Sequence, residues 1–196
     1  FCIISLDSMS SDKEQFLFKK SLELIQSGKY QAAKNSIEQL KGSPYHIYLT
    51  YKLIQRRPYL VSKDHPKIFL ARKEDSVFQD LFRKQWLNKL FQRKKYREFI
   101  TIYESKPIDG LEYKCKYFQS KIKIEPMSVP FKKIIDTWSV GKSLPRVCDY
   151  PFNYLYKNNL ISSEDYWERI SKALDKKNFK LARYLANKSE NIEMVR

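Results

Sequence analysis

The sequence predicts an all-α protein, on three observations. Apolar residues recur at the three- and four-residue spacing of amphipathic helices along most of the chain. Glycine is scarce, at 4 of 196 residues, and no Asn-Gly or Asp-Gly pair with flanking alternation marks a β-hairpin. Three short polar turns each deliver an aromatic ring to the start of the next helical pattern. We therefore predict stacked helical hairpins.

The composition supports a folded core. Hydrophobic residues make up 42% of the chain and aromatic residues 15%, so the 31% of charged residues does not indicate disorder. A chain of this length suits one domain, or a segment of a longer one.

Helix boundaries follow from glycine, proline and capping residues. The first pattern begins at Asp12 and stops at Gly28, and the second stops at Gly42. Ser43 is predicted to cap the third helix, with Pro44 at its first position. The predicted helices cover residues 12–26, 29–40, 44–57, 65–70, 76–91, 96–104, 109–124, 130–138, 149–156, 163–174 and 179–185.

Later caps are of the same kind. Asp64 is predicted to cap the short fourth helix, with Pro66 in its first turn. Pro130 starts the eighth helix. Ser162 is a strong cap for the tenth, because Glu164 and Asp165 then place acidic charge in its first turn.

The repeated turns indicate helical hairpins. They lie at residues 28–30, 94–96 and 177–179. In each, we expect the aromatic residue (Tyr30, Tyr96 or Phe179) to wedge against the preceding helix. None of these amphipathic helices can bury its apolar stripe alone, so the hairpins must stack. We predict a right-handed superhelix, that is, an α-solenoid.

Residues 138–152 are predicted to form a helix, a rigid corner and a helix. Gly141 is expected to end the first helix in a left-handed turn. Pro145 prevents simple continuation. Asp149 is expected to cap the next helix, with Pro151 tolerated in its first turn. One cysteine lies within the corner.

The net charge of +16 is compatible with nucleic acid, anionic lipid or an acidic polymer as partner. The alternative, which we favour, is that lysine simply covers the solvent faces of many helices, since it recurs from Lys13 to Lys188 without one dominant block. No run approaches the roughly 20 apolar residues of a membrane span.

The apolar start of the chain, Phe1 to Ile4, precedes a polar stretch. We interpret residues 1–11 as a signal-peptide remnant or a disordered lead-in; a first strand or a packed N-terminus is the alternative. Residues 12–196 form the helical segment. The state of Cys2 is left open.

No catalytic, cofactor or metal site is predicted. His46 and His65 lack neighbours at ligand spacing. The carboxylate pairs at 74–75 and 164–165 are explained by helix starts. Aromatic residues interleaved with lysine over 113–117 could stack on bases or sugars, but their helical spacing favours the core. No glycine-rich phosphate loop or nucleophile elbow occurs.

Cys115 and Cys148 are separated by 33 positions. From the residues alone, two buried free thiols are the favoured interpretation. A disulfide becomes the alternative if the chain is exported to an oxidising compartment.

The corner resembles that in the N-terminal superhelical domain of soluble lytic murein transglycosylases. The residues that carry this resemblance are Trp138, Gly141, Ser143, Pro145, Cys148, Asp149 and Phe152. Weaker similarity covers roughly residues 12–190, including the aromatic third helix from Pro44 to Tyr51. The resemblance implies a disulfide between Cys115 and Cys148.

In that family the superhelix forms part of a ring that supports a C-terminal lysozyme-like domain with one catalytic glutamate. The whole enzyme cleaves the β-1,4 bond between N-acetylmuramic acid and N-acetylglucosamine and leaves a 1,6-anhydro product. The family's catalytic series, Glu-Ser, then Gly-Leu-Met-Gln, then Ala-Tyr-Asn-Ala-Gly, does not occur in these 196 residues.

The resemblance therefore implies a non-catalytic, periplasmic ring scaffold, without cofactor, that binds peptidoglycan glycan strands and partners a lysozyme-like domain absent from this sequence. The alternative is a protein-interaction scaffold of tetratricopeptide type. A nucleic-acid-binding protein is disfavoured because the lysines are dispersed.

Overall fold

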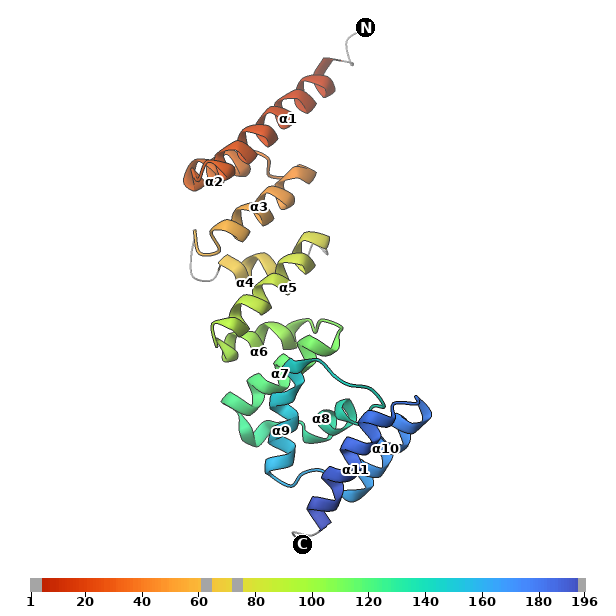
Figure 1. Cartoon of the computed structure of the whole chain (residues 1–196). Helices are drawn as coiled ribbons and strands as arrows, with labels where there is room; N and C mark the ends of the chain where they lie inside the picture. The colour runs from red at the N-terminus through yellow and green to blue at the C-terminus, as the bar shows by residue number, and fades with distance from the viewer. Residues whose placement is uncertain (1–4, 61–64, 72–75, 194–196) are drawn as a thin grey trace. The chain divides into compact units, whose positions relative to one another are not determined.

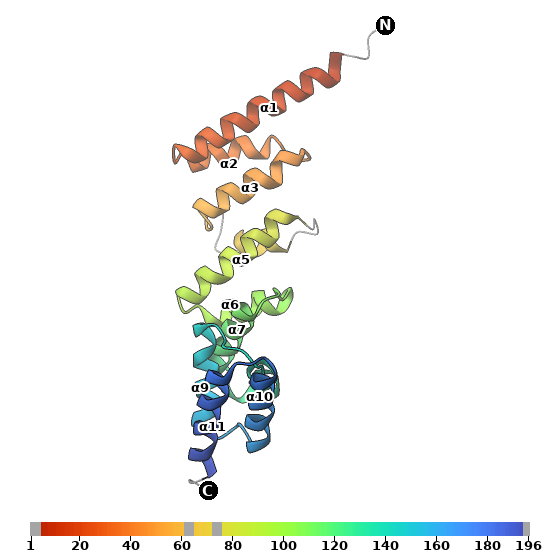
Figure 2. The same cartoon turned by 45° about the vertical axis from the view of Figure 1, so that its right-hand side comes forward.

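We describe the protein from a computed structural model. It describes the backbone of residues 5–60, 65–71 and 76–193, and the side chains of these residues apart from 5–11, 65 and 190–193. Across these ranges every regular element is an α-helix or a short 3-10 helix, which confirms the predicted all-α class (Figures 1 and 2). The chain divides into two compact units, residues 1–86 and 87–196.

The first unit is built on three mutually packed helices. Its helices are α1 (Ser5–Gln26), α2 (Tyr30–Glu38), α3 (Pro44–Arg56), α4 (His65–Leu70) and the start of α5 (Val77–Gln92). α1, α2 and α3 pack around a core that contains Leu17, Ile25, Ala33, Ile37, Leu40, Leu49 and Leu53. Between α1 and α2 the buried Ser21 hydroxyl donates to Ser36 Oγ at 2.9 Å. Two small side chains there let the helices approach closely.

The N-terminal boundary differs from the expected one. α1 begins at Ser5, before the first residue of the predicted pattern, Asp12. The origin of residues 1–11 as a signal-peptide remnant stays a prediction. The expected cap of α4, Asp64, lies outside the described residues.

The second unit contains the rest of the chain. Beyond the end of α5 its elements are α6 (Tyr96–Ser105), α7 (Leu111–Ile124), η1 (Pro126–Ser128), α8 (Phe131–Trp138), η2 (Arg146–Cys148), α9 (Asp149–Lys157), α10 (Ser163–Asp175) and α11 (Phe179–Glu193). α6 packs on α7 and α10 on α11 as hairpins. The core of this unit includes Phe118, Ile134, Trp138, Leu155 and Tyr166.

Two predicted caps are confirmed. The hydroxyl of Ser43 accepts from the N–H of Tyr45 at 3.3 Å, and Pro44 is the first residue of α3. Ser162 forms a capping box, since its hydroxyl accepts from the N–H of Asp165 at 3.2 Å and the Asp165 carboxylate accepts from the N–H of Ser162 at 2.9 Å. These local signals fix where α3 and α10 begin.

The three predicted hairpin turns share one backbone conformation. Gly28, Lys94 and Lys177 have left-handed φ angles of 76°, 57° and 55°. In each turn the next N–H reaches a carbonyl five residues back, as a Schellman end requires. These bonds are Lys29 to Leu24 at 2.9 Å, Lys95 to Leu90 at 2.9 Å and Asn178 to Ala173 at 2.8 Å. Only the first turn uses glycine, so the other two hold a side chain in a costly conformation.

The predicted wedge against the preceding helix is confirmed at Tyr96, while Tyr30 is shown only to pack against the core of its unit. Tyr96 packs on Phe91 of α5, with ring centroids 5.8 Å apart, and Tyr30 packs against the core of the first unit. The prediction for Phe179 is wrong, because that ring is 61% exposed. At this turn Asn178 fixes the start of α11 instead, its side-chain oxygen accepting from the N–H of Leu181 at 3.3 Å.

We predict that Lys94→Gly stabilises the protein. Glycine adopts the left-handed φ of position 94 without Cβ strain, so the free energy of unfolding should rise by about 0.5–1 kcal/mol despite the entropy cost of glycine. Urea unfolding followed by circular dichroism measures the change. Lys95→Gly is the matched control, since Lys95 has φ −82° and should gain nothing. Equal effects at both positions would contradict the proposed strain.

Candidate functional site

The corner connects α8 to α9 and also contacts α7 and α10. It runs through residues 139–148 and ends in η2, so the predicted helix, corner and helix are present. Pro151 lies in the first turn of α9, as expected, but Asp149 does not cap that helix. Asp149 is its first residue, and its N–H bonds back to the carbonyl of Arg146. The helix therefore starts from a 3-10 turn, without a side-chain cap.

Gly141 has a different role from the one predicted. Left-handed φ angles occur among the described glycines at Gly28, Gly42 and Gly110 but not at Gly141, so the expected left-handed turn is wrong there. A Cβ atom at position 141 would instead overlap the backbone carbonyl of Lys172 in α10. Glycine is required because two backbones touch.

Side chains of α10 hold the same corner. Arg169 Nε donates to the carbonyl of Val140 at 3.2 Å, and Lys172 Nζ donates to the carbonyl of Ser139 at 3.0 Å. These bonds satisfy carbonyl groups that follow the end of α8. The guanidinium of Arg169 also lies over the ring of Trp138, 4.4 Å from its centroid.

Around Trp138 the corner is completed by aromatic residues. Its indole Nε1 donates to the hydroxyl of Tyr156 at 2.7 Å, and the Tyr166 ring meets it edge-on at 5.2 Å. Burial lowers the pKa of Arg169 and raises the pKa of Tyr156. Both shifts reflect charged forms that lose contact with water.

A disulfide ties the corner to α7. The structure joins Cys115 of α7 to Cys148 of η2, with Cα atoms 5.0 Å apart and both residues fully buried. This separation is typical of disulfides. The corner is thus attached to α7 by a covalent bond and to α10 by backbone contact.

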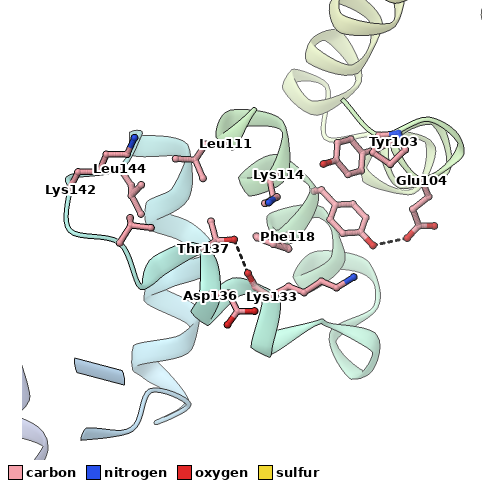
Figure 3. A pocket seen from close by; sticks show the side chains of 13 residues that line it. Tyr103, Glu104, Leu111, Lys114, Phe118, Lys133, Asp136, Thr137, Lys142 and Leu144 are labelled. Atoms are coloured by element: carbon pink, nitrogen blue, oxygen red, sulfur yellow. Dashed lines mark hydrogen bonds between the residues drawn. The ribbon is translucent and has the colours of Figure 1, made fainter. Parts of the chain in front are cut away.

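A cavity of about 620 Å³ opens between α6, α7, α8 and the corner (Figure 3). Its volume lies within the range of small-ligand pockets. The cavity is lined by Tyr103, Glu104, Pro107, Leu111, Lys114, Tyr117, Phe118, Lys133, Asp136, Thr137, Val140, Lys142 and Leu144. It lies entirely within the second unit.

One wall of this cavity is a pair of tyrosines. The rings of Tyr103 and Tyr117 are stacked with centroids 4.9 Å apart. The Tyr117 hydroxyl donates to Glu104 Oε1 at 2.7 Å, and Lys121 Nζ lies 3.4 Å from the same oxygen. Burial is the main cause that raises the pKa of both tyrosines, and the Glu104 bond adds to it at Tyr117. The Glu104 carboxylate is therefore engaged from two sides.

Sequence reasoning missed this cavity. The interleaved segment 113–117 was expected to be core, and Cys115 and Lys116 are indeed buried. Tyr117 is only partly buried, and Lys114 is exposed at the cavity mouth. The alternation of lysine and tyrosine was the available signal, but the other walls come from residues distant in the sequence.

Within the described residues, no group of three or more His, Cys, Asp or Glu side chains is placed to hold a metal ion. None of the helices there combines the length and apolarity needed to cross a membrane.

Comparison with known proteins gives matches at the level of structure. No family model and no curated protein matches the sequence. The 70-kDa soluble lytic transglycosylase in complex with bulgecin A matches with a TM-score of 0.71 and 20% identity, over 90% of this chain and 28% of that one. The chain has the fold of part of a soluble lytic transglycosylase.

Two further structures agree. The Escherichia coli 70-kDa enzyme matches with a TM-score of 0.71 and 20% identity, over 91% of this chain and 29% of that one. An inactive mutant of the lytic transglycosylase Slt from Pseudomonas aeruginosa matches with a TM-score of 0.65 and 23% identity, over 88% and 28%. The resemblance inferred from the sequence and the predicted α-solenoid class are thereby confirmed. The chain spans under a third of the length of these enzymes.

We predict that Gly141→Ala destabilises the protein by about 1–3 kcal/mol, because the added methyl group overlaps a backbone carbonyl that cannot rotate away. Chemical denaturation measures the change. Ser143→Ala, at an exposed position of the same corner, is the control and should stay within about 0.5 kcal/mol of the wild type. A Gly141→Ala protein as stable as the control would show that the corner and α10 do not touch as described.

Reduction of the disulfide should lower the free energy of unfolding by about 3–4 kcal/mol, the chain-entropy value for a loop of this size. The double variant Cys115→Ala and Cys148→Ala should behave like the reduced protein, whereas Cys2→Ser should not. Denatured, unreduced protein should show at most one free thiol per chain, since Cys115 and Cys148 are bonded to each other. Three free thiols would exclude the bond.

Proposed function

We propose that the chain is the non-catalytic superhelical domain of a periplasmic lytic transglycosylase, serving as a ring scaffold and a surface for peptidoglycan glycan strands. The observation that carries this proposal is the fold match over 90% of the chain at a TM-score of 0.71. A lysozyme-like domain would complete the enzyme and perform the cleavage to the 1,6-anhydro product.

Two carboxylates of the second unit have pKa shifts opposite to the one that a glycosidic general acid needs. A glycosidic general acid needs a carboxyl group with a raised pKa in a cleft. The pKa of Glu125 and that of Glu168 are both lowered, because Lys121 and Lys172 donate hydrogen bonds to them.

One Glu-Ser dipeptide does occur, at positions 104–105, but no Gly-Leu-Met-Gln follows it. Glu104 accepts a hydrogen bond from Tyr117 and forms an ion pair with Lys121. In both contacts the Glu104 side chain acts as an acceptor or as the partner of a cation, and neither contact places it beside a leaving sugar.

Charge supports the choice of peptidoglycan as partner. The stem peptides of peptidoglycan carry carboxylates, and the net charge of this chain is +16. Exposed lysine ammonium groups would attract such a polymer from a distance and hold it weakly at many points.

A second candidate function is a protein-interaction scaffold of tetratricopeptide type. It is favoured by large apolar side chains exposed on the hairpin of α10 and α11, where Trp167, Phe179 and Tyr184 are 61%, 61% and 51% exposed. Exposed aromatic residues are typical of surfaces that bind proteins.

The purified chain should release no anhydromuropeptides from sacculi but should sediment with them. Raising the salt from about 0.1 M to about 1 M shortens the Debye length from about 10 Å to about 3 Å, so the bound fraction should fall. Sacculi stripped of stem peptides by an amidase are the control and should retain less protein.

Product release by this chain alone would contradict the non-catalytic assignment. A bound fraction that changes neither with salt nor with removal of the stem peptides would contradict an electrostatic basis for binding. Stoichiometric capture of one protein, with no affinity for sacculi, would favour the protein-interaction scaffold instead.

A further inference from the structure

We propose that the cavity between α6, α7, α8 and the corner is a binding site for an anionic sugar, a pyranose that carries one carboxylate on a short arm. The proposal rests on the proposed function only in its choice of sugar acid. The site itself is argued from the residues that line the cavity (Figure 3).

Positive charge that is not neutralised gathers at the cavity. Lys114 of α7, Lys133 of α8 and Lys142 of the corner all line it and are exposed. Within the described part of the chain none of the three ammonium groups forms an ion pair. Each can bind an anion, and Figure 3 shows the three side chains at different places around the cavity, so a negatively charged ligand there can meet a lysine from more than one wall.

The lining also contains two acidic residues, Glu104 and Asp136, whose surroundings differ. Glu104 is engaged by Tyr117 and by Lys121, which lies outside the lining. Asp136 is exposed on α8, beside Thr137. A carboxylate in this position can accept hydrogen bonds from sugar hydroxyls.

Apolar surface completes the site. The cavity contains the side chains of Leu111, Phe118 and Leu144, together with the Tyr103 and Tyr117 pair. Apolar and aromatic walls with a few convergent polar groups are typical of small-ligand sites. The C–H face of a pyranose fits such a wall, while its hydroxyl and carboxylate groups reach the polar rim.

The contacts of the corner fix the positions of two cavity walls, α7 and the corner itself. Lys114 directly precedes Cys115 on α7, and Lys142 directly follows Gly141. The disulfide fixes α7 to η2, and Gly141 fixes the corner to α10. Two of the three lysines therefore lie next to residues whose backbone is restrained, which limits the movement of the cavity walls on binding.

N-Acetylmuramic acid and N-acetylglucosamine provide a matched pair of probes, because they differ by the carboxylate-bearing lactyl arm. Titration of the full chain, followed by amide NMR shifts, should show N-acetylmuramic acid binding about two- to fivefold more tightly, the range for an ion pair with an exposed lysine. The shifted resonances should include Tyr117 and Thr137. Equal affinity for the two sugars would overturn the proposal.

Variants test the lysines directly. The triple variant Lys114→Gln, Lys133→Gln, Lys142→Gln should lose the preference for the acidic sugar. Its control carries the same charge change at three exposed lysines of the second unit outside the cavity, in Lys132→Gln, Lys157→Gln and Lys176→Gln, and should keep the preference. Loss in the control, or lactate binding as tightly as the sugar acid, would refute an anionic-sugar site.

Sacculus sedimentation separates this proposal from the proposed function. If the chain binds sacculi but shows no preference for N-acetylmuramic acid, the cavity proposal fails and the scaffold proposal stands. If the sugar acid binds in the cavity but sacculi are not retained, the scaffold proposal fails and the cavity proposal stands.

Discussion

The corner between α8 and α9 is fixed from two sides, and the second unit depends on both attachments. On one side Cys148 is bonded to Cys115 of α7. On the other, the backbone at Gly141 rests against the carbonyl of Lys172 in α10. Much of the corner lacks regular helical hydrogen bonds, so distant contacts must offset the entropy lost when it is ordered. Between them, these contacts set the positions of α7, α9 and α10 relative to α8.

Arg169 of α10 contributes a buried guanidinium group to the packing of the corner. The guanidinium is buried, which lowers its pKa, and in the described part of the chain it forms no ion pair. An unpaired buried cation is costly, but the Trp138 ring beneath it contributes about 2 kcal/mol when desolvated, and the Val140 carbonyl accepts from Nε. A lysine could not stack and donate in this planar geometry. The arginine therefore binds the end of α8 to α10 through its shape as well as its charge.

Sequence reasoning succeeded where a structural signal lies within a few residues. The caps at Ser43 and Ser162 and the positions of the three hairpin turns are local features, and the sequence predicts them. Gly141 was misread because its reason is the backbone of Lys172, which no nearby residue reveals. Phe179 was misread because a turn positions an aromatic ring but does not decide whether a neighbour covers it. The cavity escaped notice because its walls come from separate elements.

The distribution of lysine along the sequence also differs from its distribution in space. Lysines dispersed along the chain argue against a basic block, and most of them lie on solvent faces. Yet Lys114, Lys133 and Lys142 come from three different elements and line one cavity. The net charge of +16 thus has two parts that act differently. The diffuse part draws any polyanion toward the surface and is screened by salt. The local part lies beside apolar side chains of the same cavity, and this combination is the basis for the proposed anionic-sugar site.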